Sequence, residues 1–145
     1  MFFEKKLLSK KETAQLINAI EAAELKTSGE IRVHIEKDLK EETITAACEK
    51  MFYKLNMQNT KHRNGILFYL AYNSKAFAVW GDEGIHAKVK HAFWESITNR
   101  AIQFFKKEDY ITGLEKAIEL CGEKLVEHFP LEEDDKNELP NEISY

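Results

Sequence analysis

The sequence predicts an α/β protein, a three-layer α/β/α sandwich with a small mixed sheet of three or four strands and about four main helices. Two apolar runs, Ile66–Tyr72 and Ala76–Trp80, flank the tripeptide Asn73-Ser74-Lys75. Each run is continuous rather than alternating, which predicts strands that are covered on both faces. Asparagine tolerates the left-handed conformation of tight turns, so we expect these runs to form a β-hairpin at the centre of the domain.

Helices are predicted before the first strand, between the first and second strands, and after the hairpin. Ser9 and Glu12 fit a capping box at the start of the first helix, and Gly29 suits a left-handed residue at its end. Residues 41–57 repeat apolar positions along one helical face, and so do two stretches within residues 85–130.

One further strand is predicted at residues 30–36, where polar and apolar residues alternate strictly. The helix over residues 41–57 joins it to Ile66–Tyr72, and this crossover is long enough to make the two strands parallel. The hairpin then adds its second strand antiparallel. The starts of the first two strands and the end of the third therefore meet at one edge of the sheet.

Composition and charge indicate one globular domain over residues 1–130, followed by an acidic tail, 131–145, that we expect to be disordered. Of the 145 residues, 32% are charged, and the tail holds six acids against one lysine. The body is nearly neutral, so nucleic acid is not expected as a partner. Cys48 and Cys121 lie on apolar helical faces and are expected to be buried free thiols.

The sequence shows no pattern typical of a signal peptide or a membrane-spanning segment. The N-terminal residues have no apolar core of signal-peptide length, and no segment approaches the roughly 18 apolar residues of a membrane span. We therefore expect a cytoplasmic protein with no membrane span.

Polar residues gather in three loops that the topology brings together, residues 27–30, 61–65 and 81–84. The carboxylates there are candidate ligands of a hard divalent cation, with calcium expected and magnesium the alternative. The candidate metal ligands are Glu30, Asp82 and Glu83. The candidate ligand- or phosphate-binding residues are Ser28, Gly29, Arg63 and Asn64.

Two structural roles compete with these assignments. Asp82 is equally suited to cap a helix that starts near Ile85, and Arg63 to pair with Glu30 or Asp82. A capping carboxylate can also bind a metal, so these roles are compatible.

Common catalytic centres are not indicated. The histidines form no HExxH motif, and His86 and His91 are spaced so that they do not share a helix face, which argues against zinc. A P-loop and a G-x-S-x-G nucleophile motif are missing as well. No catalytic residue is therefore assigned.

Three segments, TSGEIRVHIE, RNGILFYLA and AFAVWGDEGI, are similar in order and spacing to signature segments of the TPM domain family. The resemblance extends over about residues 3–125. It implies an α/β/α sandwich and an association with calcium binding. The family includes a thylakoid-lumen protein described as an acid phosphatase, and other members are tethered to membranes.

The residues and the resemblance together favour a small soluble TPM-like domain that binds a divalent cation at the acidic loops. A metal-assisted phosphomonoesterase, in which the cation activates water and Arg63 holds the phosphate, is the first alternative. The second alternative is an adaptor whose acidic tail and helical surface bind another protein.

Overall fold

The computed structural model describes residues 7–132 and 139–145. These residues form five helices and three strands. Their bounds are α1 (Lys10–Glu24), β1 (Glu30–Glu36), α2 (Ile44–Lys54), β2 (Gly65–Ala71), β3 (Ala76–Gly81), α3 (Glu83–His86), α4 (His91–Phe105) and α5 (Tyr110–His128). No helix of the described ranges is long and apolar enough to cross a membrane.

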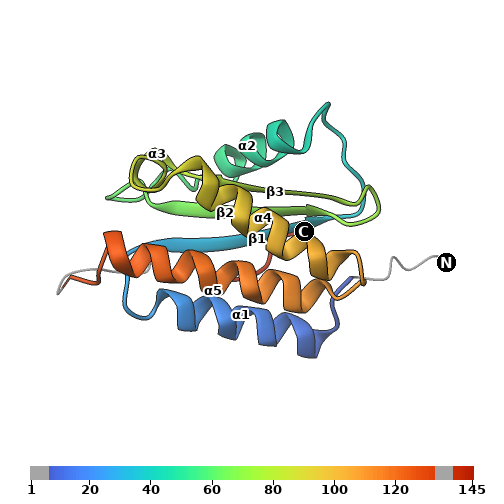
Figure 1. The fold of residues 1–145 in the computed structure, drawn as a ribbon, viewed down its shortest axis with the longest axis horizontal. Coiled ribbons are helices and arrows are strands. Elements are labelled where there is room, and N and C mark those ends of the chain that lie inside the picture. Colours follow the sequence, from blue (N-terminus) through green and yellow to red (C-terminus); the bar gives the residue numbers. More distant parts are fainter. Residues whose placement is uncertain (1–6, 133–138) are drawn as a thin grey trace.

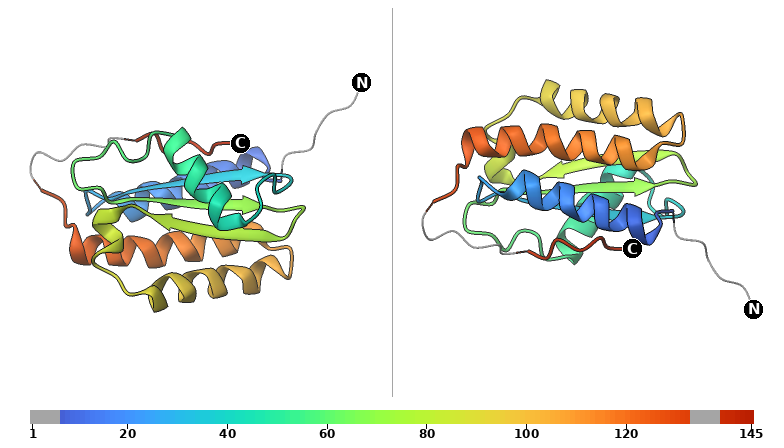
Figure 2. Two further views of the ribbon diagram at one scale, coloured as in Figure 1. Left: turned by 90° about the horizontal axis from the view of Figure 1, so that it is seen from above. Right: turned by 90° about the horizontal axis from the view of Figure 1, so that it is seen from below.

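The elements form three layers, as predicted (Figures 1 and 2). The sheet has the order β1-β2-β3, with α2 over one face and α1, α4 and α5 over the other. Each face has its own apolar core: Cys48 and Phe52 of α2 pack against one, and Ile20, Ile97 and Ile118 of the three other long helices against the other. The fold is therefore the predicted α/β/α sandwich with a mixed sheet.

The central strand is β2, and all seven of its residues are buried. It pairs in parallel with β1 and antiparallel with β3. The turn between β2 and β3 differs in one detail from the prediction, because Lys75 rather than Asn73 has the positive φ, 53°. The Asn73 amide instead donates to Asp38, 2.7 Å away, which ties the turn to the loop after β1.

The first helix begins as predicted and ends differently. Ser9 and Glu12 form the reciprocal capping box. Gly29 does not have a positive φ. A Cβ at this position would lie 2.5 Å from Cδ2 of Leu125, so the absence of a side chain at Gly29 lets this residue of α5 pack directly against the backbone. Cys48 and Cys121 are buried free thiols, as expected.

The outer edge of β1 is covered by the end of the chain. Ile35 donates its backbone N–H to the Ser144 carbonyl at 3.0 Å, and Ser144 donates to the Val33 carbonyl at 3.1 Å. Leu139 and Ile143 are each 8% exposed. Residues 139–145, predicted as disordered on composition, are thus ordered, because two apolar side chains and two backbone bonds hold them. Residues 133–138 of that predicted tail lie outside the described residues.

This segment also explains why β1 is buried on both faces although its sequence alternates. His34, on the polar side, is 2% exposed and lies 2.8 Å from the Ser144 hydroxyl through Nδ1. Its other ring nitrogen lies 3.0 Å from Glu36 Oε1, and its ring packs on Tyr69. Burial lowers the pKa of His34 below its ordinary value, against the opposing effect of Glu36.

Candidate functional site

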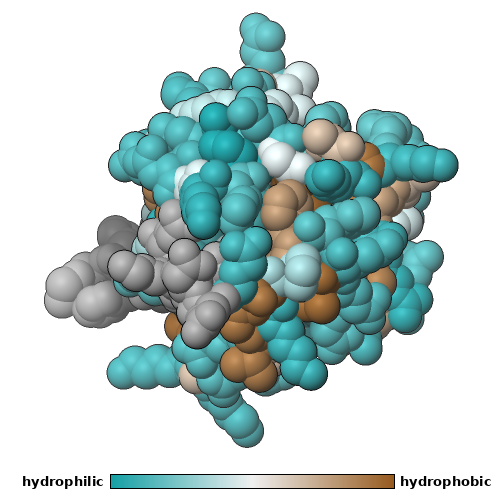
Figure 3. All heavy atoms as spheres, turned by 90° about the vertical axis from the view of Figure 1, so that its left-hand side faces the viewer, coloured by the Kyte–Doolittle hydropathy of each residue, from teal (hydrophilic) through white to brown (hydrophobic). Residues whose placement is uncertain are grey.

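The three polar loops predicted to meet do lie together, at the end of the sheet where β1 and β2 start and β3 ends. Glu30 is the register partner of Gly65, and Asp82 donates its backbone N–H to the Gly65 carbonyl at 2.9 Å. We call residues 27–30, 57–65 and 81–84 the rim. Figure 3 views the molecule from this end, where hydrophilic residues cover most of the surface around smaller apolar areas.

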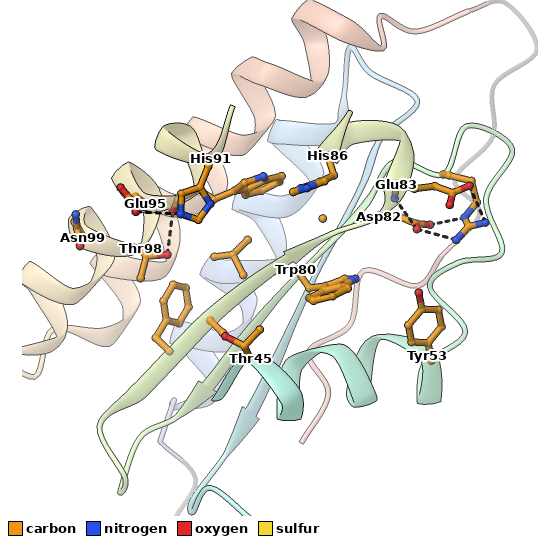
Figure 4. Close-up of a pocket in the computed structure, with 16 residues that line it drawn as sticks. Thr45, Tyr53, Trp80, Asp82, Glu83, His86, His91, Glu95, Thr98 and Asn99 are labelled. Carbon is orange, nitrogen blue, oxygen red and sulfur yellow. Dashed lines mark hydrogen bonds and ion pairs between the residues drawn. The ribbon is translucent and has the colours of Figure 1, made fainter. Parts of the chain in front are cut away.

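The strongest polar contact of the rim joins Arg63 to Asp82. Arg63 Nε lies 2.7 Å from Oδ2 of Asp82, and Nη2 lies 2.9 Å from Oδ1, a two-pronged pairing of guanidinium and carboxylate (Figure 4). Nη1 lies 3.2 Å from Oε1 of the exposed Glu83. Donation of these hydrogen bonds to Asp82 raises the pKa of Arg63 above its ordinary value. Both acidic groups at the end of β3 are therefore satisfied by one cation.

Asp82 is also a helix cap. Its Oδ1 accepts the backbone N–H of Glu83 at 2.8 Å, and α3 begins at that residue. Both structural roles considered for Asp82 are thus present together. Because Asp82 is 2% exposed, its charge depends on these partners for stabilisation.

The loops at Arg63 and Gly84 are interlocked. Arg63 has φ 50°, a left-handed conformation that is uncommon for a non-glycine residue. Its carbonyl accepts the N–H of Gly84 at 2.8 Å. A Cβ on Gly84 would collide with the carbonyl oxygens of His62 and Arg63, so only glycine fits here. This close backbone contact fixes the arginine beside Asp82.

Two buried carboxylates lie on the same face of the sheet. Glu30, Gly65 and Asp82 occupy one row across the three strands, and strand alternation points all three toward the α2 layer. Glu30 and Asp82 are each 2% exposed. Between them Gly65 has no side chain, and the Met57 carbonyl oxygen lies 3.2 Å from the position that its Cβ would take. This row combines two carboxylates with a backbone oxygen.

The remaining predicted residues are placed differently. Strand alternation turns Asn64 away from this row, and its Nδ2 donates to Ser28 Oγ at 3.2 Å. Asn64 is fully buried, and its Oδ1 has no hydrogen-bond partner in the part of the chain that the structure describes. The N–H of Gly29 donates to Thr27 Oγ1 at 3.0 Å. The predicted set therefore divides between Glu30 with Asp82 and Glu83 on one side, and Ser28 with Asn64 on the other.

One carboxyl group of this end was missed by the sequence analysis. Glu24, the last residue of α1, accepts the N–H of Ile31 at 2.7 Å through Oε2. Burial raises the pKa of Glu24 to about 8, although the Ile31 bond opposes this, and the nearby charge of Glu30 adds to the rise. The signal was its position four residues after Ile20, on the apolar stripe of α1. The Met57 carbonyl had no sequence signal.

The chemistry that this donor set offers is that of hard oxygen ligands. Among the described residues no group of three His, Cys, Asp or Glu side chains is placed to hold a metal ion. Burial raises the pKa of both thiols, Cys48 and Cys121, so neither is a reactive thiolate. Carboxylate and carbonyl oxygens are the ligand types that calcium and magnesium take in proteins.

Comparison with known proteins agrees with this fold. The family model of the TPM domain matches residues 2–124. The chain is similar over 99% of both lengths to the BA42 protein of the psychrophilic bacterium Bizionia argentinensis, with 39% sequence identity and a TM-score of 0.89. This protein belongs to the TPM domain family. No curated protein sequence matches it significantly.

Two more distant solved structures share the fold. One is the N-terminal domain of the cg2496 protein of Corynebacterium glutamicum, 14% identical, with a TM-score of 0.65 over 81% of this chain and 74% of that one. The other is the N-terminal domain of a protein from P. gingivalis, 18% identical, with a TM-score of 0.68 over 87% and 83%. At these identities the likeness supports the fold alone.

Proposed function

We propose that this TPM domain is a binding module for a divalent cation, with calcium as its ion and the row Glu30–Gly65–Asp82 as its site. The observation that carries the proposal is the placement of Glu30 and Asp82, both 2% exposed, on one face beside a glycine. Burying a carboxylate is costly unless hydrogen bonds or a cation compensate it, so two carboxylates buried in one row are an unusual feature for a sheet to carry without a ligand-binding role.

In the absence of a metal, Arg63 is the compensating cation of Asp82. Its guanidinium uses both carboxylate oxygens, at 2.7 and 2.9 Å. A divalent ion therefore competes with Arg63 for Asp82, while Glu30 and the Met57 carbonyl supply further oxygens. Because the site offers few protein ligands and a competitor, we expect weak binding, with a Kd of about 10⁻⁴–10⁻³ M.

Glu83 has a secondary part in this proposal. It is 73% exposed and contacts Arg63 at 3.2 Å. When the ion takes Asp82, the freed guanidinium can stay close to Glu83, which limits its movement. Anion binding at Arg63 is less favoured, because the carboxylates of Asp82 and Glu83 repel a phosphate.

The test is a two-dimensional amide NMR titration of the metal-free protein with Ca²⁺, Mg²⁺ and inorganic phosphate in separate series. Calcium is expected to shift the amides of Glu30, Gly65 and Asp82 together, and the Nε–H signal of Arg63. Phosphate is expected to leave these signals unchanged. A phosphate response centred on Arg63 without a calcium response would contradict the proposal and favour an anion site.

A matched pair of variants separates metal ligation from capping. Asp82→Asn removes a proposed ligand and weakens a cap, whereas Asp109→Asn weakens only the cap of α5, whose Thr112 N–H lies 3.3 Å from the Asp109 carboxylate. Only Asp82→Asn is expected to abolish the calcium shifts. Equal loss in both variants would mean that the shifts report general stability.

A further inference from the structure

The two outer edges of the sheet differ in whether another segment of the chain pairs with them. Residues 143–145 run beside β1, where Ser144 exchanges two backbone hydrogen bonds with Val33 and Ile35. β3 forms the opposite edge. Within the part of the chain that the structure describes, no backbone hydrogen bond joins the outer side of β3 to another segment.

The register shows which groups of β3 face outward. Asp82 donates to the Gly65 carbonyl, and hydrogen-bonded and non-hydrogen-bonded pairs alternate along an antiparallel ladder. Ala78 and Trp80 therefore bond to β2. The N–H and C=O groups of Phe77, Val79 and Gly81 point away from the sheet.

This outward edge is the floor of a groove of about 610 Å³. Figure 4 shows its walls, with Thr45 and Tyr53 of α2 on one side of β3 and His91, Glu95, Thr98 and Asn99 of α4 on the other. β3 spans six residues, so the floor is about 20 Å long at roughly 3.3 Å per residue. A groove of these proportions has the shape of one extended segment.

Two features distinguish this edge from one that is protected against pairing. β3 contains no proline and no charged residue, and its register with β2 has no bulge, whereas natural edges usually carry such devices. Trp94 lines the groove with 9% of its surface exposed, and its indole Nε1 has no hydrogen-bond partner among the described residues. Its six-membered ring lies against Gly81, so a donor is buried next to the outward backbone of β3.

A single strand suits this groove better than a second copy of the chain. Residues of α2 and α4 line it on both sides of β3, and pairing of two β3 edges would bring these helices of both copies together. We therefore consider a single strand without flanking helices as the occupant.

Charge indicates the chemistry of that strand. Three carboxylates, of Asp82, Glu83 and Glu95, line the groove. Arg63 pairs with the first two, and His91 lies 3.0 Å from Glu95, so the carboxylates outnumber the one arginine of the lining. Glu83 and Glu95 are 73% and 63% exposed. Trp80 and Tyr53 offer aromatic faces at the α2 wall, to which a Lys or Arg side chain is attracted.

We propose that the groove over β3 binds an extended, basic peptide segment of a partner protein, which adds a fourth strand to the sheet. Backbone bonds to Phe77, Val79 and Gly81 give the affinity, and Lys or Arg side chains beside Glu83 and Glu95 give the preference for basic sequences.

The test uses the acetylated and amidated peptide KVTVKVT at millimolar concentration, with EDTA present so that the result is independent of any cation site. Binding is followed by amide hydrogen exchange and NMR. The peptide is expected to protect the amides of Phe77, Val79 and Gly81 from exchange and to shift the Trp94 indole signal. The peptide EVTVEVT, and KVTVKVT N-methylated along its backbone, are expected to produce neither effect.

Two variants at one position separate backbone pairing from side-chain contact. Val79→Pro removes an outward N–H without breaking the ladder to β2, and Val79→Ala keeps that N–H. The proline variant is expected to lower peptide affinity at least about tenfold, and the alanine variant less than about threefold. Absence of protection in the wild type, equal binding by the N-methylated peptide, or protection caused by dimerisation of the domain would each overturn the proposal.

Discussion

The two ends of β2 differ in how deeply their polar groups are buried, although the same three strands form both ends. At the hairpin end the polar contacts lie in water: exposed Asn73 donates to exposed Asp38, and Ser74 accepts the N–H of Leu39. At the rim the polar groups are buried, with Glu30 and Asp82 each 2% exposed. A turn can be closed by exposed groups, so the buried carboxylates of the rim are not required merely to end the strands.

The backbone shows the same contrast. The hairpin end uses one left-handed residue, Lys75, in an exposed turn. The rim places left-handed Arg63 against Gly84, where no other residue fits. Such constraints are typical of sites that hold side chains in a required geometry.

The largest expected effect comes from the core that supports both ends. Phe68 is fully buried in the middle of β2, so Phe68→Ala is expected to lower the free energy of unfolding by about 3–5 kcal/mol. Trp80→Ala is expected to cost less, because Trp80 is only half-buried in the groove wall. Urea unfolding of both variants measures this, and equal losses would mean that the groove is closed in solution.

Removal of the C-terminal segment tests how far the β1 edge depends on its cover, which reaches from Leu139 near Gly65 to Ser144 beside Val33 and Ile35. Truncation after Leu131 removes the buried Leu139 and Ile143 and the two backbone bonds of Ser144. We expect a loss of about 2–4 kcal/mol by thermal or urea unfolding. A truncated chain as stable as the full one would show that this segment is dispensable.

A matched pair of substitutions breaks one carboxylate at each end. Asp82→Asn weakens a buried acceptor of Arg63 and of the Glu83 N–H, and is expected to cost about 1–3 kcal/mol in the metal-free protein. Asp38→Asn, which weakens an exposed contact at the hairpin end, is expected to stay within about 0.5 kcal/mol. Equal losses in the free energy of urea unfolding would show that the burial of Asp82 adds nothing to the cost of its substitution.

The pH dependence of stability should also come from the rim end. The pKa of Glu24 is raised to about 8, so between its ordinary value and pH 8 the folded state holds a proton that the unfolded chain has lost. Stability therefore falls as pH rises through this range. Glu24→Gln is expected to gain stability relative to wild type between pH 5 and 8, whereas Glu49→Gln, at an exposed position of α2, is not. Parallel curves of stability against pH for Glu24→Gln and wild type would contradict the raised pKa of Glu24 in the folded state.

The sequence was sufficient for the topology and for which loops meet, because continuous and alternating apolar runs determine which strands are central and how crossovers connect them. It was not sufficient for the pairing within the rim. The fork of Arg63 on Asp82 depends on a left-handed backbone at Arg63, and arginine is not a residue in which this conformation is expected. The row formed by Glu30 and Asp82 depends on strand register, which only the three-dimensional structure defines.

Composition and helical periodicity were also insufficient to predict burial in two places. An acidic segment was expected to be disordered, yet Leu139 and Ile143 within it are buried. Trp94 lies beside the main apolar stripe of α4, yet it is only 9% exposed, since Gly81 leaves room for its ring. Both are tertiary effects, which periodicity along one helix or segment does not contain.

The central claim is that Arg63 and a divalent cation compete for Asp82. The most direct measurement is the calcium affinity of Arg63→Gln and of wild type by isothermal titration calorimetry, with Lys50→Gln as control. Lys50 is 72% exposed and pairs with Glu41, so its loss removes the same charge away from the rim.

Competition predicts that Arg63→Gln binds calcium at least about tenfold more tightly than wild type, while Lys50→Gln changes affinity by less than about twofold. An Arg63→Gln variant that binds calcium no more tightly than wild type would contradict the claim.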